Sequence, residues 1–307
     1  MVLNILLLVI GFVLLIRGAD AFIEGASALA HRFNIPEIII GLTIVAMGTS
    51  APEAAVSISS VLHGANSVAI GNALGSNIVN ILFVLGIAAV ITPLTIKNKT
   101  VRYEIPFLIF STLALMWFGV EHSVIARTAA GVLLLLFAMF LGYLYFNARR
   151  EILNAEKQIP ECSIAKMVVF LIFGLVALVL GSDLTVKSAT GLATLLHIPG
   201  RIIGLTVIAI GTSLPELVTC ITAARKKHVN LVIGNIIGSN IFNILFVLGL
   251  AGLVRPIRFE YVFAVDAAIS VMITIMLWLC AIYVQKLNRK MGILFLICYA
   301  GYLVYLI

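Results

Sequence analysis

Long apolar runs recur along the whole chain, and they limit its fold more than any other feature. Hydrophobic residues make up 62% of the sequence and charged residues only 11%, whereas a soluble domain carries about 25% charged residues. The hydrocarbon core of a bilayer is about 30 Å thick, and a helix of roughly 20 apolar residues can cross it. The composition therefore predicts an all-α integral membrane protein that is surrounded by lipid.

The apolar runs predict ten transmembrane helices joined by short connections. The first five are expected at 2–29, 36–62, 67–92, 104–120 and 124–147, and the second five at 164–190, 199–224, 230–254, 261–284 and 290–306. The longest polar stretch, Asn147–Lys166, is too short for a soluble regulatory domain. No basic segment precedes the first run, which is therefore expected to be a spanning helix and not a secretory signal.

The positions of lysine and arginine predict how the chain lies in the membrane. One set of loops holds Arg32, Lys97, Lys99, Arg102, Arg149, Arg150, Lys157, Lys166, Arg225, Lys226, Lys227, Lys286, Arg289 and Lys290. The opposite loops hold only Arg127, Arg201, Arg255 and Arg258. Basic residues favour cytoplasmic loops, so both termini are expected outside the cytoplasm, in a multi-pass protein of the cell membrane. This bias accounts for the net charge of +7 without a nucleic-acid partner.

An internal repeat appears when the chain is shifted by 163 residues. Gly18–Pro93 then aligns with Gly181–Pro256 without a gap, and 35 of the 76 pairs are identical. GLTIVAMGTSAPE at 41–53 matches GLTVIAIGTSLPE at 204–216, and GNALGSNIVNILFVLG at 71–86 matches GNIIGSNIFNILFVLG at 234–249. Shared apolar composition would not preserve Gly, Thr, Ser, Pro, Glu and Asn together over such lengths.

The repeat divides the chain into two halves, 1–150 and 151–307, each with five predicted helices. Because five is an odd number, the second half must enter the membrane from the opposite side. This is the inverted-repeat architecture of secondary transporters, in which ion sites form near the bilayer midplane between the repeats.

Two glutamates within apolar spans are the most informative residues. Glu53 and Glu216 are equivalent in the repeat, and each follows the start of its predicted span by 17 residues. An ionised carboxylate at that depth costs several kcal/mol unless it is paired or coordinated, and neither has a lysine or arginine nearby in sequence. The pair indicates a bound cation; two protonated, structural glutamates are the alternative.

The residues around each glutamate favour a hard cation. Pro52 and Pro215 lack the amide hydrogen that would bond the carbonyls of Gly48 and Gly211. Carbonyl oxygens are therefore expected to be available there, as in the broken helices of transporters. Four hydroxyl groups neighbour these turns, those of Thr49, Ser50, Thr212 and Ser213. Ca²⁺ and Na⁺ prefer such oxygen ligands, although a structural proline kink remains the alternative.

A second motif, GNxxGSNxxN, occurs in the next span of each half. Its small residues let helices approach closely. Ser76 and Asn80 are four residues apart and share one helix face, as do Ser239 and Asn243. Asn80 and Asn243 are candidate ligands, with hydrogen bonding between helices as the alternative. The asparagine that directly follows each serine is more typical of such interhelical bonding.

The other charged, histidine and cysteine residues give weaker signals. Arg17 with Asp20, and Asp183 with Lys187, have the spacing of local ion pairs on a helix. The histidines and cysteines form no metal-ligand pattern, and neither HExxH nor a Walker A motif occurs. The sequence therefore predicts neither an enzyme nor an ATP-driven pump. No resident cofactor is expected either, and the cations would be transported substrates.

At these residues the chain resembles the calcium/cation antiporter superfamily, and most of all its prokaryotic sodium/calcium exchangers. GTSAPE with GTSLPE, and GNALGSNIVN with GNIIGSNIFN, are similar to the two signature repeats of that family, and the resemblance extends over essentially the whole chain. It implies four clustered cation sites. The residues that it implies are Glu53, Glu216 and the carbonyls of Thr49 and Thr212 for Ca²⁺; the carbonyls of Ala46 and Ala209 with the hydroxyls of Ser50, Ser76, Ser213 and Ser239 for Na⁺; and Asn80 and Asn243 bordering the middle site.

One position departs from the pattern of some relatives. An archaeal exchanger, among others, carries aspartate where this chain has Asn243, so the centre here would hold two carboxylates and not three. In the K⁺-dependent branch of the family an aspartate at this place is associated with K⁺ use. The resemblance therefore favours K⁺ independence for this chain.

The function predicted from these features is a secondary antiporter in which Na⁺ entry drives Ca²⁺ out by alternating access. Ca²⁺ or several Na⁺ would neutralise Glu53 and Glu216, and neutralisation would permit passage between inward- and outward-facing states. The resemblance makes the first and sixth spans candidates for the moving element, and the chain is expected to function as a monomer. The alternatives are a Ca²⁺/H⁺ antiporter, which would not need the twin serines, a K⁺-dependent Na⁺/Ca²⁺ antiporter, and a cation channel.

Overall fold

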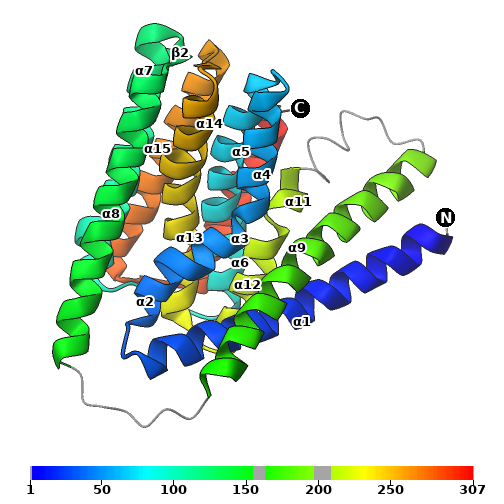
Figure 1. Ribbon diagram of the computed structural model, residues 1–307, viewed down its shortest axis with the longest axis vertical. Coiled ribbons are helices and arrows are strands. Elements are labelled where there is room, and N and C mark those ends of the chain that lie inside the picture. Colours follow the sequence, from blue (N-terminus) through cyan, green and yellow to red (C-terminus); the bar gives the residue numbers. More distant parts are fainter. Residues whose placement is uncertain (1, 155–162, 197–208, 307) are drawn as a thin grey trace.

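The computed structural model describes residues 2–154, 163–196 and 209–306, and these residues are almost entirely helical (Figure 1). Eight of the described helices are long and apolar enough to cross a membrane, and the bent pair Glu37–Thr49 and Ala51–Leu62 would be a ninth if the two helices form one span. The predicted span at 199–224 falls partly on residues outside the described ranges. The prediction of an all-helical membrane protein is confirmed, and the count of ten stays a prediction.

The elements follow one another in two similar series, in which η marks a π-helical segment. The first is α1 (Val2–Arg32), α2 (Glu37–Ile40), η1 (Gly41–Val45), α3 (Ala46–Thr49), α4 (Ala51–Leu62), α5 (Asn66–Ile78), η2 (Val79–Val84), α6 (Leu85–Ile91), β1 (Leu94–Thr95), η3 (Thr100–Glu104), α7 (Ile105–His122), β2 (Val124–Ile125) and α8 (Arg127–Asn154). The second is α9 (Ile164–Leu195), α11 (Ala209–Thr212), α12 (Leu214–Arg225), α13 (Val229–Ile241), η5 (Phe242–Val247), α14 (Leu248–Val254), β3 (Ile257–Arg258), α15 (Tyr261–Val284), β4 (Lys286–Leu287) and α16 (Arg289–Leu306).

The bounds of the central elements recur at the spacing of the sequence repeat. Helices α3, α4, α5 and α6 begin and end 163 residues before α11, α12, α13 and α14, and η2 stands in the same relation to η5. Packing is reciprocal as well, since α8 packs on α14 while α16 packs on α6. Two short antiparallel sheets join the halves, with β1 paired to β4 and β2 paired to β3.

Several helix ends differ from the sequence prediction. Helix α8 continues to Asn154, so the first part of the predicted Asn147–Lys166 loop is helical. The span expected at 124 begins at Arg127, because Val124 and Ile125 pair with β3. The span expected at 104 begins at Thr100 with the π-helical segment η3. Each difference arises from hydrogen bonds at a helix end, which hydropathy does not report.

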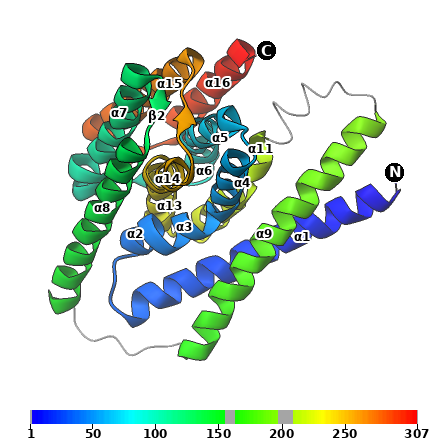
Figure 2. The ribbon, with the colours of Figure 1, turned by 45° about the horizontal axis from the view of Figure 1, so that its top comes forward.

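Helices α1 and α9 run side by side and extend away from a bundle formed by the other elements (Figures 1 and 2). Small residues let their backbones touch. A Cβ atom added at Gly174 would lie 2.5 Å from the Phe22 backbone nitrogen, and one added at Gly18 would lie 2.9 Å from the Ala177 Cβ. Such close packing of small residues is a means by which helices associate in lipid.

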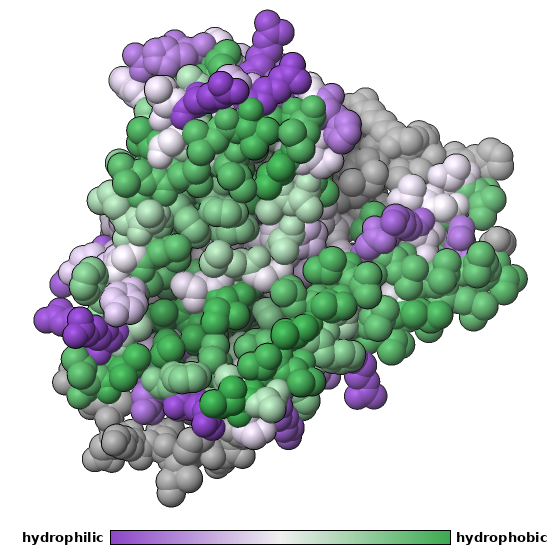
Figure 3. Space-filling view, in the orientation of Figure 1, coloured by the Kyte–Doolittle hydropathy of each residue, from purple (hydrophilic) through white to green (hydrophobic). Residues whose placement is uncertain are grey.

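The molecule has a buried centre and an apolar outer surface. In Val229–Val254, 94% of the most apolar stretch is buried, against 22% in α1, so α13 and α14 lie at the centre. On the outside, Leu3 is 66% exposed and Val304 is 76% exposed. Figure 3 shows hydrophobic residues over most of the middle of one face, with hydrophilic residues gathered toward its top and lower edges. This distribution fits a bilayer.

Two charge pairs were predicted within spans, and one of the two is wrong. Lys187 Nζ lies 2.8 Å from Asp183 Oδ2, as the spacing predicted. Asp20, in contrast, pairs with Lys226 at 3.3 Å and not with Arg17. Helix α1 packs against α12, and this contact brings Lys226 within reach of Asp20. The local spacing rule does not include partners from another helix.

Candidate functional site

Each GTSxPE motif breaks its helix at the serine. Ser50 (φ −84°, ψ 9°) separates α3 from α4, and Ser213 (φ −87°, ψ 9°) separates α11 from α12. The first break bends the span by 48°. Pro52 and Pro215 lie in the first turn after each break, where the missing amide hydrogen is tolerated. The broken helices predicted from the two prolines are therefore present.

The carbonyls opposite the prolines accept hydrogen bonds within the protein. The Gly211 carbonyl accepts a hydrogen bond from Ser182 Oγ on α9 at 2.8 Å, and the Gly48 carbonyl accepts a backbone N–H at the end of α3. The Ser182 hydroxyl thus replaces the bond that Pro215 removes, and because a carbonyl oxygen has two lone pairs, the availability of both carbonyls to a cation stays a prediction. Ser239 Oγ donates to the Ala46 carbonyl at 3.4 Å, and both groups belong to the set predicted to bind Na⁺.

Glu53 and Glu216 are completely buried and are linked across the two halves. Ser50 Oγ donates to Glu216 Oε1 at 2.7 Å, and Ser213 Oγ donates to Glu53 Oε1 at 3.4 Å. Each break thus places its serine on the glutamate of the other half. The two carboxylates lie close enough for their charges to repel each other.

Four buried oxygens in this region have no hydrogen-bond donor among the described residues: Glu53 Oε2, Glu216 Oε2, Asn80 Oδ1 and Asn243 Oδ1. All four side chains are fully buried. Neither glutamate forms an ion pair with a basic residue in the part of the chain that the structure describes. A buried acceptor without a donor costs about 1–3 kcal/mol, and more when it is charged. All four are acceptors of the kind that a hard cation binds.

The π-helical segments that hold the two asparagines pack against the helices of the opposite glutamates. Asn80 lies in η2, which packs against α12, the helix of Glu216. Asn243 lies in η5, which packs against α4, the helix of Glu53. A π-helical turn is rare and is found frequently at functional sites. Nothing in the spacing of the motif predicted these turns.

Two further asparagines, which were not among the predicted ligands, hydrogen-bond to residues of the site. Asn72 Nδ2 donates to the Glu53 carbonyl at 3.1 Å and to Ser57 Oγ at 3.0 Å. Its repeat equivalent Asn235 has an Oδ1 that lies 3.1 Å from Thr49 Oγ1 and 3.4 Å from Ser239 Oγ. The repetition of this asparagine in the GNxxGSN motif was the available signal.

Asn235 also reaches the buried Cys220, because its Nδ2 donates to the sulfur at 3.3 Å. Cys220 occupies the repeat position of Ser57, so this one hydrogen bond recurs in both halves.

For the remaining predicted ligands the structure gives the position in the helix and, for some, the burial of the side chain. Thr49 is fully buried at the end of α3, and Thr212 ends α11. Ser76 is buried in α5. Ala209, another predicted Na⁺ ligand, begins α11, but its side-chain surroundings lie outside the described residues. The roles of Ser76 and Ala209 as Na⁺ ligands therefore stay predictions.

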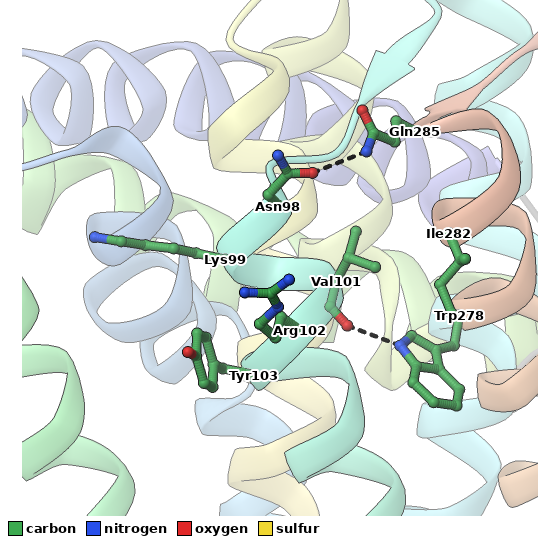
Figure 4. Close-up of a pocket in the computed structure, with 8 residues that line it drawn as sticks. All are labelled: Asn98, Lys99, Val101, Arg102, Tyr103, Trp278, Ile282 and Gln285. Carbon is green, nitrogen blue, oxygen red and sulfur yellow. Dashed lines mark hydrogen bonds between the residues drawn. The ribbon is translucent and has the colours of Figure 1, made fainter.

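An open pocket lies elsewhere, between the start of the η3–α7 helix and the end of α15 (Figure 4). Its volume is about 780 Å³, and it is lined by Asn98, Lys99, Val101, Arg102, Tyr103, Trp278, Ile282 and Gln285. Trp278 Nε1 donates to the Val101 carbonyl at 2.7 Å, and Gln285 Nε2 donates to Asn98 Oδ1 at 2.8 Å. No predicted ion ligand lines this pocket, so it is separate from the buried glutamates.

Comparison with known proteins places these features in a wider group. The family described as "Sodium/calcium exchanger protein" matches residues 3–146 and 166–307. The sodium/calcium exchanger MaX1 of Methanosarcina acetivorans is 30% identical, with 99% of this chain and 98% of that protein covered. The inner membrane protein YrbG of Escherichia coli is 35% identical, with 91% and 90% covered. A structure of the sodium-calcium exchanger NCX_Mj, soaked with zero Na⁺ and Ca²⁺, matches with a TM-score of 0.88 at 33% identity and covers 100% of this chain and 99% of that one.

Proposed function

Because this chain belongs to the sodium/calcium exchanger family, we propose that it exchanges Na⁺ for Ca²⁺ across the cell membrane by alternating access. Its relatives are transporters, and the chain is a membrane transporter and not an enzyme. The finer assignment of the coupling ions, of the ligands and of the orientation is our inference from the buried site.

The observation that carries the proposal is the set of four unpartnered oxygens on Glu53, Glu216, Asn80 and Asn243. All four are acceptors, two belong to carboxylates, and each half of the chain contributes two. Carboxylate and amide oxygens are the ligands that Ca²⁺ prefers. Two negative charges can be balanced by one Ca²⁺ or by more than one Na⁺, so the same oxygens can serve both ions in turn.

Charge balance also accounts for coupling. With the site empty, two buried carboxylates near each other would have to move through a low-dielectric region, at a cost of several kcal/mol. With Ca²⁺ or Na⁺ bound, the charge is neutralised and the passage between the two open states becomes accessible. Helices α1 and α9 are the proposed moving pair, because they contact each other along their length and extend from the bundle (Figure 2).

We further infer that the chain forms ten spans in two inverted five-helix repeats, 1–150 and 151–307. The common 163-residue spacing of the central elements, the two sheets that join the halves and the crossed serine–glutamate bonds support this arrangement. One chain would then contain the complete site, so a monomer is expected to function.

The test of the proposed function is Ca²⁺ uptake by the purified protein in proteoliposomes, with outward gradients of Na⁺, K⁺ or H⁺ imposed in turn. We expect an outward Na⁺ gradient alone to drive Ca²⁺ accumulation. Uptake driven only by H⁺ would identify a Ca²⁺/H⁺ antiporter, and a K⁺ requirement would identify the K⁺-dependent branch. Ca²⁺ movement that never exceeds equilibrium would identify a channel.

The two serines at the helix breaks should act more on Na⁺ than on Ca²⁺. In Ser50→Ala and Ser213→Ala, one hydroxyl beside a shared carboxylate is lost, and Na⁺ half-saturation should rise roughly three- to tenfold, as for one hydrogen bond of about 1 kcal/mol. Ca²⁺ affinity should change less, because its two carboxylates remain. Flux titrations with each ion measure both quantities. Equal losses for both ions would show that the serines are only structural.

The orientation can be tested by labelling. Single cysteines at the termini should react with an impermeant maleimide added outside cells, whereas a cysteine within residues 155–162 should react only after the membrane is opened. The background requires replacement of the four native cysteines. This pattern follows from the basic loops predicted to be cytoplasmic. Labelling of the 155–162 position in intact cells would reverse the proposed orientation.

A further inference from the structure

Asn77 and Asn240 form a reciprocal clasp between α5 and α13. Asn77 Nδ2 donates to the backbone carbonyl of Asn240 at 3.1 Å, and Asn240 Nδ2 donates to the backbone carbonyl of Asn77 at 3.2 Å. Both side chains are buried. Hydrogen bonding between helices was the preferred sequence interpretation for these two residues, and this interpretation is confirmed.

The clasp fixes the direction in which the NH₂ group and the Oδ1 atom of each asparagine side chain point. A backbone carbonyl can only accept a hydrogen bond, so each clasp asparagine must turn its NH₂ group toward it and keep its Oδ1 as an acceptor. Asn240 Oδ1 then accepts from Asn80 Nδ2 at 3.1 Å, and Asn77 Oδ1 accepts from Asn243 Nδ2 at 3.4 Å. Asn80 and Asn243 are consequently left with buried, unpartnered Oδ1 atoms.

This orientation matters for a cation. The two ends of an asparagine amide are nearly the same in size, and its terminal torsion is broad and roughly two-fold, so packing alone distinguishes them weakly. An oxygen at a cation site attracts the ion, whereas an NH₂ group in the same place repels it. Only hydrogen bonding fixes the choice, and here the bonds come from the clasp.

We propose that Asn77 and Asn240 are positioning residues that hold the amide oxygens of Asn243 and Asn80, respectively, toward the transported cation. The proposal rests on the proposed function, which makes Asn80 and Asn243 ligands. The relation is crossed, because Asn240 of the second half orients Asn80 of the first, and Asn77 of the first half orients Asn243 of the second. Each half therefore orients a ligand of the other.

The test uses aspartate, whose two carboxylate oxygens are equivalent, so that either orientation presents an oxygen. In the full-length purified protein, Asn240→Ala should weaken Ca²⁺ binding about tenfold, as for a lost hydrogen bond to a charged centre. The same substitution made in an Asn80→Asp background should raise the Ca²⁺ dissociation constant by no more than about threefold. In an Asn243→Asp background it should still cost about tenfold, because Asn243 is oriented by the other clasp residue.

Asn77→Ala supplies the mirror control. Asn77→Ala should no longer weaken Ca²⁺ binding in the Asn243→Asp background, and it should still weaken Ca²⁺ binding in the Asn80→Asp background. Calcium titration calorimetry measures each dissociation constant, and size-exclusion profiles confirm folding. If an alanine variant is not recovered from membranes, serine replaces alanine, because its shorter side chain cannot make both bonds.

The possible outcomes separate the two proposals. Equal costs in both aspartate backgrounds would overturn the positioning role and leave a purely structural clasp, while Ca²⁺ binding by the wild type would leave the proposed function standing. A wild type that binds no Ca²⁺ would overturn the proposed function and the positioning role together. Rescue that follows the crossed pairing would support both.

Discussion

Glu53→Gln and Glu216→Gln are each expected to abolish Na⁺-driven Ca²⁺ exchange while leaving the protein folded in the membrane. Glutamine keeps the shape of the side chain and an oxygen for the serine that donates to it. It replaces the unpartnered Oε2 by an NH₂ group and removes the charge that offsets Ca²⁺ desolvation. Removing one partner of a buried charge pair costs about 3–5 kcal/mol, so exchange should fall at least about a hundredfold. Ca²⁺ flux into proteoliposomes measures this loss.

Glu104→Gln is the matched control for these two variants. Glu104 is also a buried glutamate within a span, its Oε1 accepts from Tyr143 Oη at 2.8 Å, and its Oε2 has no donor among the described residues. It lies in η3, outside the cluster, and its repeat position holds Ala267. We expect this variant to exchange at close to the wild-type rate. If Glu53→Gln or Glu216→Gln, present in the membrane at wild-type amount, behaved like Glu104→Gln, the two-carboxylate site would be wrong.

Much of the site could be predicted because it is repeated. A carboxylate without a basic neighbour gives a weak signal by itself, but Glu53 and Glu216 at equivalent positions limit the explanation to something that both halves share. Ser50 and Ser213 were predicted as ligands in the same way, because they too occupy equivalent positions in the repeat. The structure adds that each serine bonds to the glutamate of the other half, a crossing that a linear alignment cannot show because it pairs equivalent residues and not neighbouring ones.

The features that the sequence did not predict depend on tertiary packing. The Gly211 carbonyl accepts from Ser182, which comes from a different helix, so the loss of a bond at Pro215 did not leave that carbonyl without a donor. Asp20 finds Lys226 for the same reason. The π-helical segments η2 and η5 depend on a local hydrogen-bond shift within a continuous apolar run. Hydropathy and motif spacing are the same with or without that shift.

Replacing Asn243 by aspartate is expected to make transport markedly more sensitive to protons. The substitution adds a third carboxylate near two that already repel each other, so at least one must bind a proton or an additional cation. Asn243 now donates from Nδ2 to Asn77 Oδ1 at 3.4 Å. A carboxylate in its place would set two acceptors against each other, whereas a protonated carboxyl could donate to Asn77 Oδ1. The clasp therefore provides a position for the proton.

The sign of the effect follows from competition between the proton and the cation. As pH falls, a cluster of three carboxylates takes up a proton at higher pH than a cluster of two, so protons compete with the cation for the carboxylates over a wider pH range and exchange slows. Inhibition should therefore extend to higher pH than in the wild type, in Na⁺-driven Ca²⁺ flux measured from about pH 5.5 to 8.5, where a perturbed carboxyl titrates. Asn243→Ala, which adds no charge, should keep the wild-type pH profile even if its flux is lower.

A second substitution tests whether the clasp residue Asn77 accepts the hydrogen bond from this protonated carboxyl. In an Asn243→Asp protein, Asn77→Ala removes the acceptor that would hold the proton, so the inhibition should move back toward lower pH. Asn240→Ala leaves Asn77 Oδ1 in place and should not move it. Superimposable pH profiles for the wild type and Asn243→Asp would mean that this side chain does not face the ion cluster. If the pH profile shifts in Asn243→Asp but does not change when Asn77→Ala is added, the third carboxylate lies at the site but Asn77 does not bind its proton.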